Sequence, residues 1–292
     1  MATLKELKTK IASLSSTQKM TKTMKLVAAS RMRKATMAQE NAKDYALKLE
    51  ELMANVAGSS QSLSHPLLNQ NAGAGKALML VIASDRGLCG GFNNNLFRTV
   101  KQWLKKTAPS IAENIEFSFC GRRAYSYFRH ETTVKDYYEG VTDRPKYADA
   151  ARIGDELMQA YESGEYDAIY VSYSRFKNAL VQFPTITKLL PIDAEDQPEA
   201  GGDAKATESD YLYEPAVAEL MADMLPNAVK FRLYNMFLEN GAGEHAARMT
   251  AMDSATRSAG DLIDHYTLIH NRERQAAITS ELIDIVVGAE SL

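Results

Sequence analysis

The segment MTKTMKLVAASRMRKA, residues 20–35, lies within residues 1–57, which contain no proline and no glycine. This composition, rich in Ala, Lys, Met and Leu, favours one helix about 80 Å long at 1.5 Å per residue. Such a length predicts a coiled coil or a shaft rather than an ordinary globular helix. A seam with spacings of three and four residues begins with large apolar side chains and continues with smaller, more polar ones: Leu4, Leu7, Ile11, Leu14, Gln18, Thr21, Lys25 and Ala28.

This predicted helix carries one sign of charge over much of its length. A solvated helix face usually mixes both signs, and a nucleic-acid site usually places aromatic side chains among the cations. Neither pattern occurs here, whereas methionines, which adapt to changing partners, are interleaved. Docking against an acidic protein surface is the interpretation that fits both features. Between Leu7 and Gln39 there is no Asp or Glu, and the basic residues are Lys8, Lys10, Lys19, Lys22, Lys25, Arg31, Arg33 and Lys34.

The middle of the chain, residues 76–192, alternates strand-like and helix-like segments, which predicts a Rossmann-like α/β domain with a mainly parallel sheet. QFPTITKLLP, residues 182–191, is expected to be an edge strand or an extended exit from the sheet, because Pro184 cannot donate a ladder hydrogen bond. The other predicted strands are KALMLVIAS (76–84), IEFSFCG (115–121) and YDAIYVSYS (166–174), and the predicted helices cover residues 92–106, 122–129 and 147–164.

A second helical arm is predicted after the α/β domain. Residues 193–210, DAEDQPEAGGDAKATESD, predict an acidic flexible connection. A short helix is expected to end before Pro226, and a long helix of about 90 Å is expected from Asn227 to about Val287. Gly241 and Gly243 each weaken that helix by about 1 kcal/mol relative to alanine, so packing neighbours are expected there.

The two arms carry opposite charge, which favours their pairing in a coiled coil. Residues 1–57 contain 11 basic and 5 acidic residues, a net +6, whereas residues 210–292 contain 6 basic and 13 acidic residues, a net −7. The fold class predicted is therefore α/β, with a long coiled coil of the N- and C-terminal helices and the α/β domain inserted between them. The divisions are 1–57, 76–192, 193–210 and 211–292, and the seam of the second arm is Met249, Met252, Thr256, Ala259, Ile263 and Tyr266.

Several classes of protein do not fit the composition of the 292 residues. A net charge of −3 argues against a uniformly basic nucleic-acid binder. No run approaches 18 apolar residues, and the first residues lack a secretory signal or a transit peptide, so a cytosolic location is expected. The five histidines have no metal-ligand spacing, and the two cysteines, Cys89 and Cys120, are expected to be reduced core thiols.

The loop SDRGLCGGFN, Ser84–Asn93, is the segment most like a ligand-binding motif. A glycine-rich turn between a buried strand and a helix is a common site for phosphate or dinucleotide. Its glycines do not fit G-x-G-x-x-G, and no Lys-Ser/Thr pair follows as in a P-loop. A protein-contact loop is preferred, and the alternative is an α/β nucleotide-binding enzyme with helical oligomerisation arms.

Taken in order, several segments resemble the gamma subunits of F-type (rotary) ATP synthases of the bacterial type. They are KIASLSSTQKMTKTMKLVAASRMRKA, SDRGLCGGFN, DYLYEP, EHAARMTAMDSATRSAGDLI and NRERQAAITSELIDIVVGA, and they span the chain. The resemblance implies a central rotor stalk without a catalytic site or cofactor of its own, which couples proton-driven rotation to ATP synthesis. The implied partners are the alpha and beta subunits of the catalytic hexamer, the epsilon subunit and the membrane ring of c subunits, with no nucleic acid. The implied location is peripheral, on the cytoplasmic face of the bacterial inner membrane.

The resemblance also implies partner-binding residues. One basic segment would face acidic loops of the beta subunits: Lys19, Lys22, Met24, Lys25, Arg31, Arg33 and Lys34. Near the C-terminus, Arg274, Gln275 and Thr279 would meet a beta loop, and the tip with Ile285 and Val286 would sit in an apolar sleeve. Arg86, Gly87 and Cys89 belong to the loop expected beside the coiled coil.

Two positions depart from the family pattern. Ser258 stands where Asn is usual, and Glu273 replaces a small residue in N-R-x-R-Q. The acidic segment 193–210 contains no cysteine, so the thiol switch of chloroplast relatives is not expected.

Overall fold

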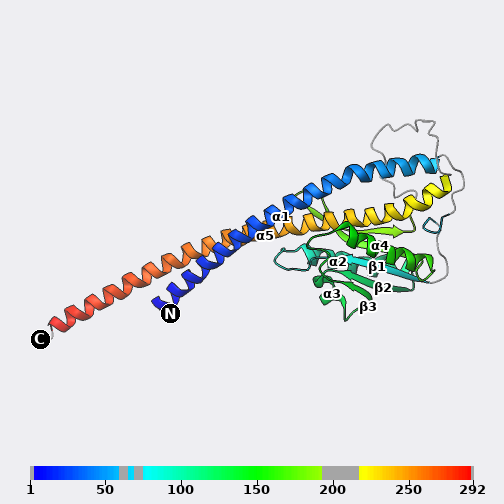
Figure 1. The fold of residues 1–292 in the computed structure, drawn as a ribbon. Helices are drawn as coiled ribbons and strands as arrows, with labels where there is room; N and C mark the ends of the chain where they lie inside the picture. Colours follow the sequence, from blue (N-terminus) through cyan, green and yellow to red (C-terminus); the bar gives the residue numbers. More distant parts are fainter. Residues whose placement is uncertain (1–2, 59–64, 69–74, 193–216, 291–292) are drawn as a thin grey trace. The chain divides into compact units, whose positions relative to one another are not determined.

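The computed structural model describes residues 3–58, 65–68, 75–192 and 217–290 (Figure 1). The predicted acidic connection, residues 193–210, lies outside the described residues. Two compact units form: Met1–Ala29 with Arg248–Leu292, and Ser30–Ala247. The long helices α1 (Leu4–Gly58) and α5 (Val217–Glu290) contribute to both units. Within the described ranges, no helix has the length and apolar character needed to cross a membrane.

The first unit is an antiparallel pair formed by the start of α1 and the last part of α5. Thr21 and Thr256 place their hydroxyl oxygens 2.7 Å apart. Farther along, the Lys10 ammonium lies 4.4 Å from the centroid of the Tyr266 ring. Residue numbers along α5 therefore rise as those along α1 fall. The two contacts thus show that the helices are antiparallel, and they set the register of the pair.

The predicted seams of both arms lie in this interface. Leu7 and Ala28 of α1 are buried, as are Met252 and Ala259 of α5. Near the polar centre of the seam, a side chain added at Gly260 would lie 3.0 Å from the Gln18 amide nitrogen. Large apolar residues become rarer along the seam of α1, as expected. In their place, the two helix backbones approach closely at Gly260, and the hydroxyl groups of Thr21 and Thr256 contact each other.

The second unit contains a five-stranded sheet in the order β3-β2-β1-β4-β5. Strands β1 to β4 are parallel and β5 is antiparallel at the edge, as predicted for the segment that contains Pro184. The strands are β1 (Lys76–Ile82), β2 (Asn114–Cys120), β3 (Thr133–Tyr138), β4 (Ala168–Phe176) and β5 (Gln182–Leu190).

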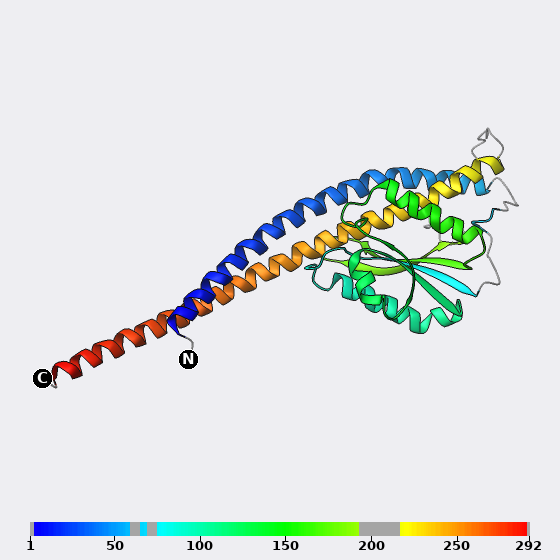
Figure 2. The ribbon, with the colours of Figure 1, turned by 60° about the horizontal axis from the view of Figure 1, so that its bottom comes forward.

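Helices cover both faces of the sheet (Figure 2). Alternate residues of β1 contribute to two cores, which explains its uninterrupted apolar sequence. One core contains Leu78 and Leu80 with α4 (Tyr147–Glu162) and the first part of α5. The other contains Met79 and Val81 with α2 (Phe92–Lys106) and α3 (Arg122–Phe128). A short 3₁₀ helix, η1 (Ala108–Ser110), follows α2.

Strand β3 was not predicted from the sequence. Its segment, TVKDYY, pairs with β2 and has a register shift beside Phe117 and Ser118. Two charged residues and a half-buried edge position hide the alternation expected of a strand. The predicted fold class, a coiled coil of the terminal helices with an inserted α/β domain, is confirmed. The predicted domain boundaries stay a prediction.

The expectation that a helix ends before Pro226 is wrong, because α5 continues through this residue. Proline removes one backbone donor and crowds the preceding turn. The neighbouring Leu225 and Val229 are almost completely buried in the core of the second unit. The Asn227 side-chain amide donates to the Asp223 carbonyl at 2.9 Å. Core packing on both sides of the proline keeps the helix continuous.

The glycines of α5 allow close packing, as expected. A side chain on Gly243 would lie 3.2 Å from the Phe92 ring and 3.3 Å from the Gln182 side chain. Gly241 faces the Pro145 ring and the Thr142 carbonyl, each 3.8 Å from the position of an added side chain. The residues that weaken α5 locally are therefore the points where neighbouring loops and strands approach it most closely.

Asn240 of α5 holds the end of strand β4. Its side-chain oxygen accepts a hydrogen bond from the Ser174 backbone N–H at 3.2 Å, in the interior. The β1 ladder ends at Ser172 of β4, so Asn240 supplies an acceptor beyond that point.

We expect Asn240→Ala to lower the free energy of unfolding by about 1–3 kcal/mol, because a buried backbone donor loses its partner. Asn227→Ala, an exposed site on the same helix, is the matched control and should change it by less than about 0.5 kcal/mol. Urea unfolding followed by the fluorescence of Trp103, the single tryptophan, measures both. Equal values for the two variants would contradict the role given to Asn240.

Candidate functional site

The predicted basic residues of the first unit divide into exposed and internally bonded ones. Lys19 and Lys22 are exposed. Lys25 instead forms an ion pair of 2.5 Å with Asp253 of α5, and Arg257 contacts the other oxygen of that carboxylate at 2.9 Å. The hydrogen bond from Lys25 lowers the pKa of Asp253. Lys25 thus joins the two helices, and Lys19 and Lys22 remain directed to solvent.

Apolar side chains accompany these exposed cations. Met20 is 62% exposed and Leu26 is 63% exposed, whereas Met24 is half-buried at the edge of the helix pair. Soluble proteins can expose single apolar residues, but exposed Met and Leu between cations match a surface that another protein covers.

The basic residues of α1 in the second unit divide in the same way. The Arg31 guanidinium contacts the Asp143 carboxylate at 2.9 Å, in the loop between β3 and α4. Arg33 and Lys34 are exposed. The sequence predicted that all six of these cations bind a partner. In the structure, Lys25 and Arg31 form ion pairs within the chain. The other four face solvent: Lys19, Lys22, Arg33 and Lys34.

The loop Ser84–Asn93 is joined to Asp143 by a network that we call the Asp85–Asp143 clasp. Asp85 accepts hydrogen bonds from the Arg122 backbone N–H at 3.1 Å and the Thr142 hydroxyl at 2.7 Å. Next to Thr142, the Asp143 carboxylate lies 3.9 Å from Arg86 and contacts Arg31. The clasp therefore ties α1, the β1–α2 loop, the β3–α4 loop and the start of α3 together.

We expect Asp143→Asn to lower the free energy of unfolding by about 1 kcal/mol, because two guanidinium groups lose an anionic neighbour at a partly exposed site. The difference in the free energy of unfolding between this variant and the parent chain should shrink at high salt. Salt already screens the attraction between Asp143 and the two guanidinium groups in the parent chain, so less is lost on substitution. Glu139→Gln, in the same loop, is a charge-matched control. Urea unfolding at two salt concentrations measures the effect, and a salt-independent difference would contradict the electrostatic explanation.

The interior of the same loop is bonded by its own side chains. The Asn93 amide donates to the Ser84 hydroxyl at 2.7 Å and to the Cys89 sulfur at 3.3 Å. Cys89 is 3% exposed, whereas Leu88, with a positive φ of 64°, is 64% exposed. The thiol predicted at a contact surface faces the loop interior, and the adjacent leucine is the side chain presented to solvent.

The C-terminal part of α5 extends beyond the region paired with α1 in the first unit (Figures 1 and 2). Arg274, Gln275 and Thr279 are exposed there, and the Thr279 hydroxyl donates to the Gln275 carbonyl at 2.9 Å. The large apolar side chains of the last turns are exposed by at least half: Ile278, Leu282, Ile283, Ile285, Val286 and Val287. An exposed apolar helix end of this size indicates a surface that is covered in an assembly.

Sequence reasoning missed the residues of the clasp that lie outside α1 and the loop Ser84–Asn93. Asp143 and Thr142 lie in a turn-like segment, VTDRP, whose composition gives no sign of a partner more than a hundred residues away. Residues 135–149 mix acidic and basic side chains, so no local charge pattern would have suggested such a contact.

Comparisons with known proteins agree over the full length. A family model described as ATP synthase matches residues 3–292. The ATP synthase gamma chain of Pelotomaculum thermopropionicum is 41% identical over 293 residues, with 100% of each chain covered. The ATP synthase gamma chain of Erythrobacter litoralis is 40% identical over 296 residues, again with 100% of each chain covered.

Solved structures give a similar fold at lower identity. A chain in the Euglena gracilis mitochondrial ATP synthase, from the OSCP/F1/c-ring assembly in rotational state 3, aligns with a TM-score of 0.68 and 19% identity over 99% of this chain and 94% of that chain. A chain of the rotor of the same enzyme, in rotational state 1, aligns with a TM-score of 0.64 and 18% identity over 94% of this chain and 98% of that chain. At these identities the likeness concerns the fold alone.

Proposed function

The chain belongs to the ATP synthase gamma-chain family, and from this membership we propose that it is the central rotor stalk of an ATP synthase. In this role it couples proton-driven rotation of a membrane ring to conformational change at the catalytic sites of the beta subunits. The observation that carries the proposal is the antiparallel helix pair of the first unit, whose α5 end extends past α1 with exposed apolar side chains. Such an end suits insertion into a surrounding assembly.

A physical argument connects this shape to coupling. An asymmetric shaft inside a ring of three equivalent sites makes different contacts with each site at any moment. Each site's open and closed conformations are then biased to a different extent, and rotation passes the bias from site to site. A chain with this role needs no catalytic site, and we propose that it has none of its own.

The partners follow as part of the proposal. We infer that the chain contacts the alpha and beta subunits of the catalytic hexamer, the epsilon subunit and the c ring, and lies peripherally at the cytoplasmic face of the bacterial inner membrane. The gamma-chain relatives come from bacteria, and the similar solved chains come from assemblies named as rotor and as OSCP/F1/c-ring.

The exposure of the side chains refines the proposed contacts. Lys19, Lys22, Arg33 and Lys34 are free to meet acidic loops of the beta subunits, because they point to solvent. Lys25 and Arg31 instead act by positioning α1 through their carboxylate partners. At the other end, Arg274, Gln275 and Thr279 meet a beta loop, and the tip with Ile285 and Val286 fits an apolar sleeve.

Co-purification tests the proposal directly. A tagged chain expressed with the alpha and beta subunits is expected to be recovered with both, and ATPase activity is expected from the assembly and not from the chain alone. Titration calorimetry of the isolated chain with ATP and with NAD is the control. Recovery of the chain without the other subunits, together with tight nucleotide binding, would instead favour an α/β nucleotide-binding enzyme.

A further inference from the structure

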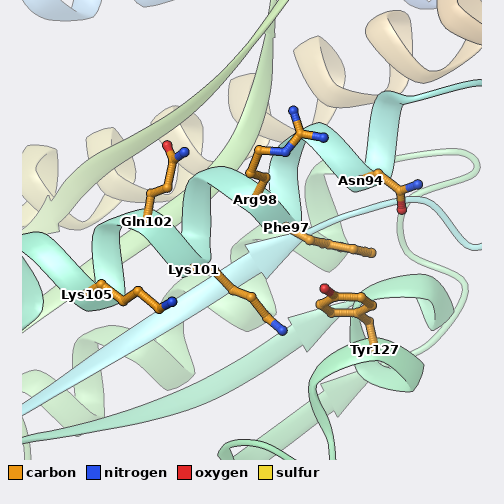
Figure 3. Close-up of a pocket in the computed structure, with 7 residues that line it drawn as sticks. All are labelled: Asn94, Phe97, Arg98, Lys101, Gln102, Lys105 and Tyr127. Carbon is orange, nitrogen blue, oxygen red and sulfur yellow. The ribbon is translucent and has the colours of Figure 1, made fainter.

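A groove lies along the outer side of α2 in the second unit, next to α3 (Figure 3). Its volume is about 510 Å³, and its lining includes no basic side chain of α1 and no residue of the Asp85–Asp143 clasp. The lining residues are Asn94, Phe97, Arg98, Lys101, Gln102, Lys105 and Tyr127.

The floor of the groove is aromatic and fixed in place. The rings of Phe97 and Tyr127 are stacked, with centroids 4.7 Å apart and planes 24° from parallel. Phe97 is buried in the core, whereas Tyr127 is 44% exposed. A packed ring beside a partly exposed one gives a rigid apolar edge that loses little conformational entropy when a ligand covers it.

Lys101 is held over this platform. Its ammonium lies 4.7 Å from the Tyr127 centroid and forms an ion pair of 2.8 Å with Glu131. The hydrogen bond that the Lys101 ammonium donates to the Glu131 carboxylate raises the pKa of Lys101, so the side chain remains a cation. Glu131 neutralises this cation in the free chain and fixes its position beside the ring.

The other cations of the groove are not neutralised in this way. Arg98 and Lys105 are exposed, and among the residues that the structure describes neither has a carboxylate within ion-pair distance. Figure 3 shows Lys101 and Lys105 on the side of Tyr127, and Arg98 and Gln102 leaving the helix on its other side. Positive charge therefore lies along both edges of one exposed face of α2, and Glu131 neutralises only Lys101 among these cations.

The length of the lined surface indicates the kind of anion. From Asn94 to Lys105 the helix rises about 16 Å at 1.5 Å per residue, which is much longer than a single phosphate or carboxylate. One small ion cannot contact both ends, whereas an extended segment with several carboxylates and an apolar side chain can contact the cations and cover the Tyr127 ring at the same time. Arginine and lysine along one helix face suit such a segment.

We propose that this α2–α3 groove is a docking site for an acidic segment of a partner protein, which places carboxylates on Arg98 and Lys105 and an apolar side chain against the part of Tyr127 that Phe97 and Lys101 leave exposed. The partner's carboxylates also compete with Glu131 for Lys101. The site lies on the sheet-covering helices and is additional to the contacts proposed for α1 and the end of α5.

A local reporter in the full-length chain tests binding directly. Cys89 and Cys120 are both buried, so Gln102→Cys introduces an accessible thiol that takes a fluorophore inside the groove. A glutamate-rich peptide with one phenylalanine is the probe, a glutamine-rich peptide of the same length is its control, and inorganic phosphate tests for a small-ion site. The local label separates this binding from attraction of the peptide to α1.

We expect the glutamate peptide to change the label's fluorescence at low salt, and Arg98→Glu with Lys105→Glu to weaken its binding by about tenfold or more. Lys106→Glu is the control, because it makes the same charge change at one residue of the same helix outside the groove. It should alter the affinity for the peptide by less than about threefold. Saturation by phosphate alone, equal binding of the glutamine peptide, or equal loss in the Lys106→Glu chain would overturn the proposal.

Photocrosslinking in the assembled complex identifies the partner. A benzophenone on Gln102→Cys is expected to join a segment rich in Asp and Glu from another polypeptide, and the adduct should disappear when Arg98 and Lys105 are reversed. A complex that assembles normally but gives no adduct, or gives an adduct with lipid, would refute the docking site while leaving the stalk role intact. Failure of the unsubstituted chain to assemble would count against the stalk role instead, and the peptide titration would still decide the groove.

Discussion

Reversing the charge of two exposed cations of α1, Lys22→Glu with Arg33→Glu, is expected to reduce ATP-driven proton pumping per ATP hydrolysed by about tenfold. Both side chains face solvent, so the substitution changes the surface offered to partners without removing an internal contact. Like charges across an interface cost several kcal/mol, and about 1.4 kcal/mol corresponds to a factor of ten. Pumping and hydrolysis measured in the same inverted membrane vesicles give the ratio.

The charge-preserving pair Lys22→Arg with Arg33→Lys is the matched control, because it alters shape and keeps the sign. It should retain most of the coupling. A normal pumping ratio in the reversed chain would refute the role of charge on this helix, whereas equal loss in both variants would assign the effect to shape. Lys25 and Arg31 are left unchanged because their substitution would break contacts to Asp253 and Asp143.

Gly121→Ala is expected to lower the free energy of unfolding by about 3 kcal/mol or more, because two penalties coincide there. Gly121 has a φ of +95°, and an added methyl carbon would lie only 2.2 Å from the carbonyl oxygen of Ala83, the residue after β1. The obstacle is backbone at the end of a neighbouring strand, where Ala83 also donates to the Cys120 carbonyl at 2.9 Å. The sheet must shift to admit the methyl group.

Gly140→Ala separates the two penalties. Gly140 also has a positive φ, +77°, but nothing lies within 4 Å of an added methyl carbon. Backbone strain alone should therefore cost about 1 kcal/mol. Urea unfolding followed by Trp103 measures both variants, since this side chain packs against Tyr170 in the second unit with ring centroids 5.0 Å apart. Equal destabilisation would show that steric contact at Ala83 is unimportant.

The elements that the sequence predicted correctly are those specified by local pattern. The length of α1, the strands β1, β2, β4 and β5 and the helices between them follow from periodicity, glycine placement and continuous apolar runs. The strand β3 and the continuity through Pro226 were missed because their stability comes from packing. TVKDYY becomes a strand through β2, and Pro226 stays helical because Leu225 and Val229 are buried on either side of it.

The candidate site divides along the same line. Charge sign and exposure of Lys19, Lys22, Arg33 and Lys34 could be inferred from composition. The internal bonding of Lys25 and Arg31 could not, because their partners Asp253 and Asp143 are distant in sequence and their pairing depends on the register of two helices and one loop. The α2–α3 groove was also missed, since its cations looked like an ordinary helix face until Tyr127 from α3 supplied a floor.

The helix pair of the first unit has a consequence for biosynthesis. Its two helical segments come from opposite ends of this sequence, so one leaves the ribosome long before the other. The second unit, in contrast, is formed by the contiguous residues 30–247. The α/β unit can therefore fold while synthesis continues, and the first part of α1 must wait, with Leu7 and Ala28 uncovered, until the region around Met252 and Ala259 emerges. Closure of the pair thus comes last, so we expect that a chain whose synthesis stops before Met252 cannot form this helix pair.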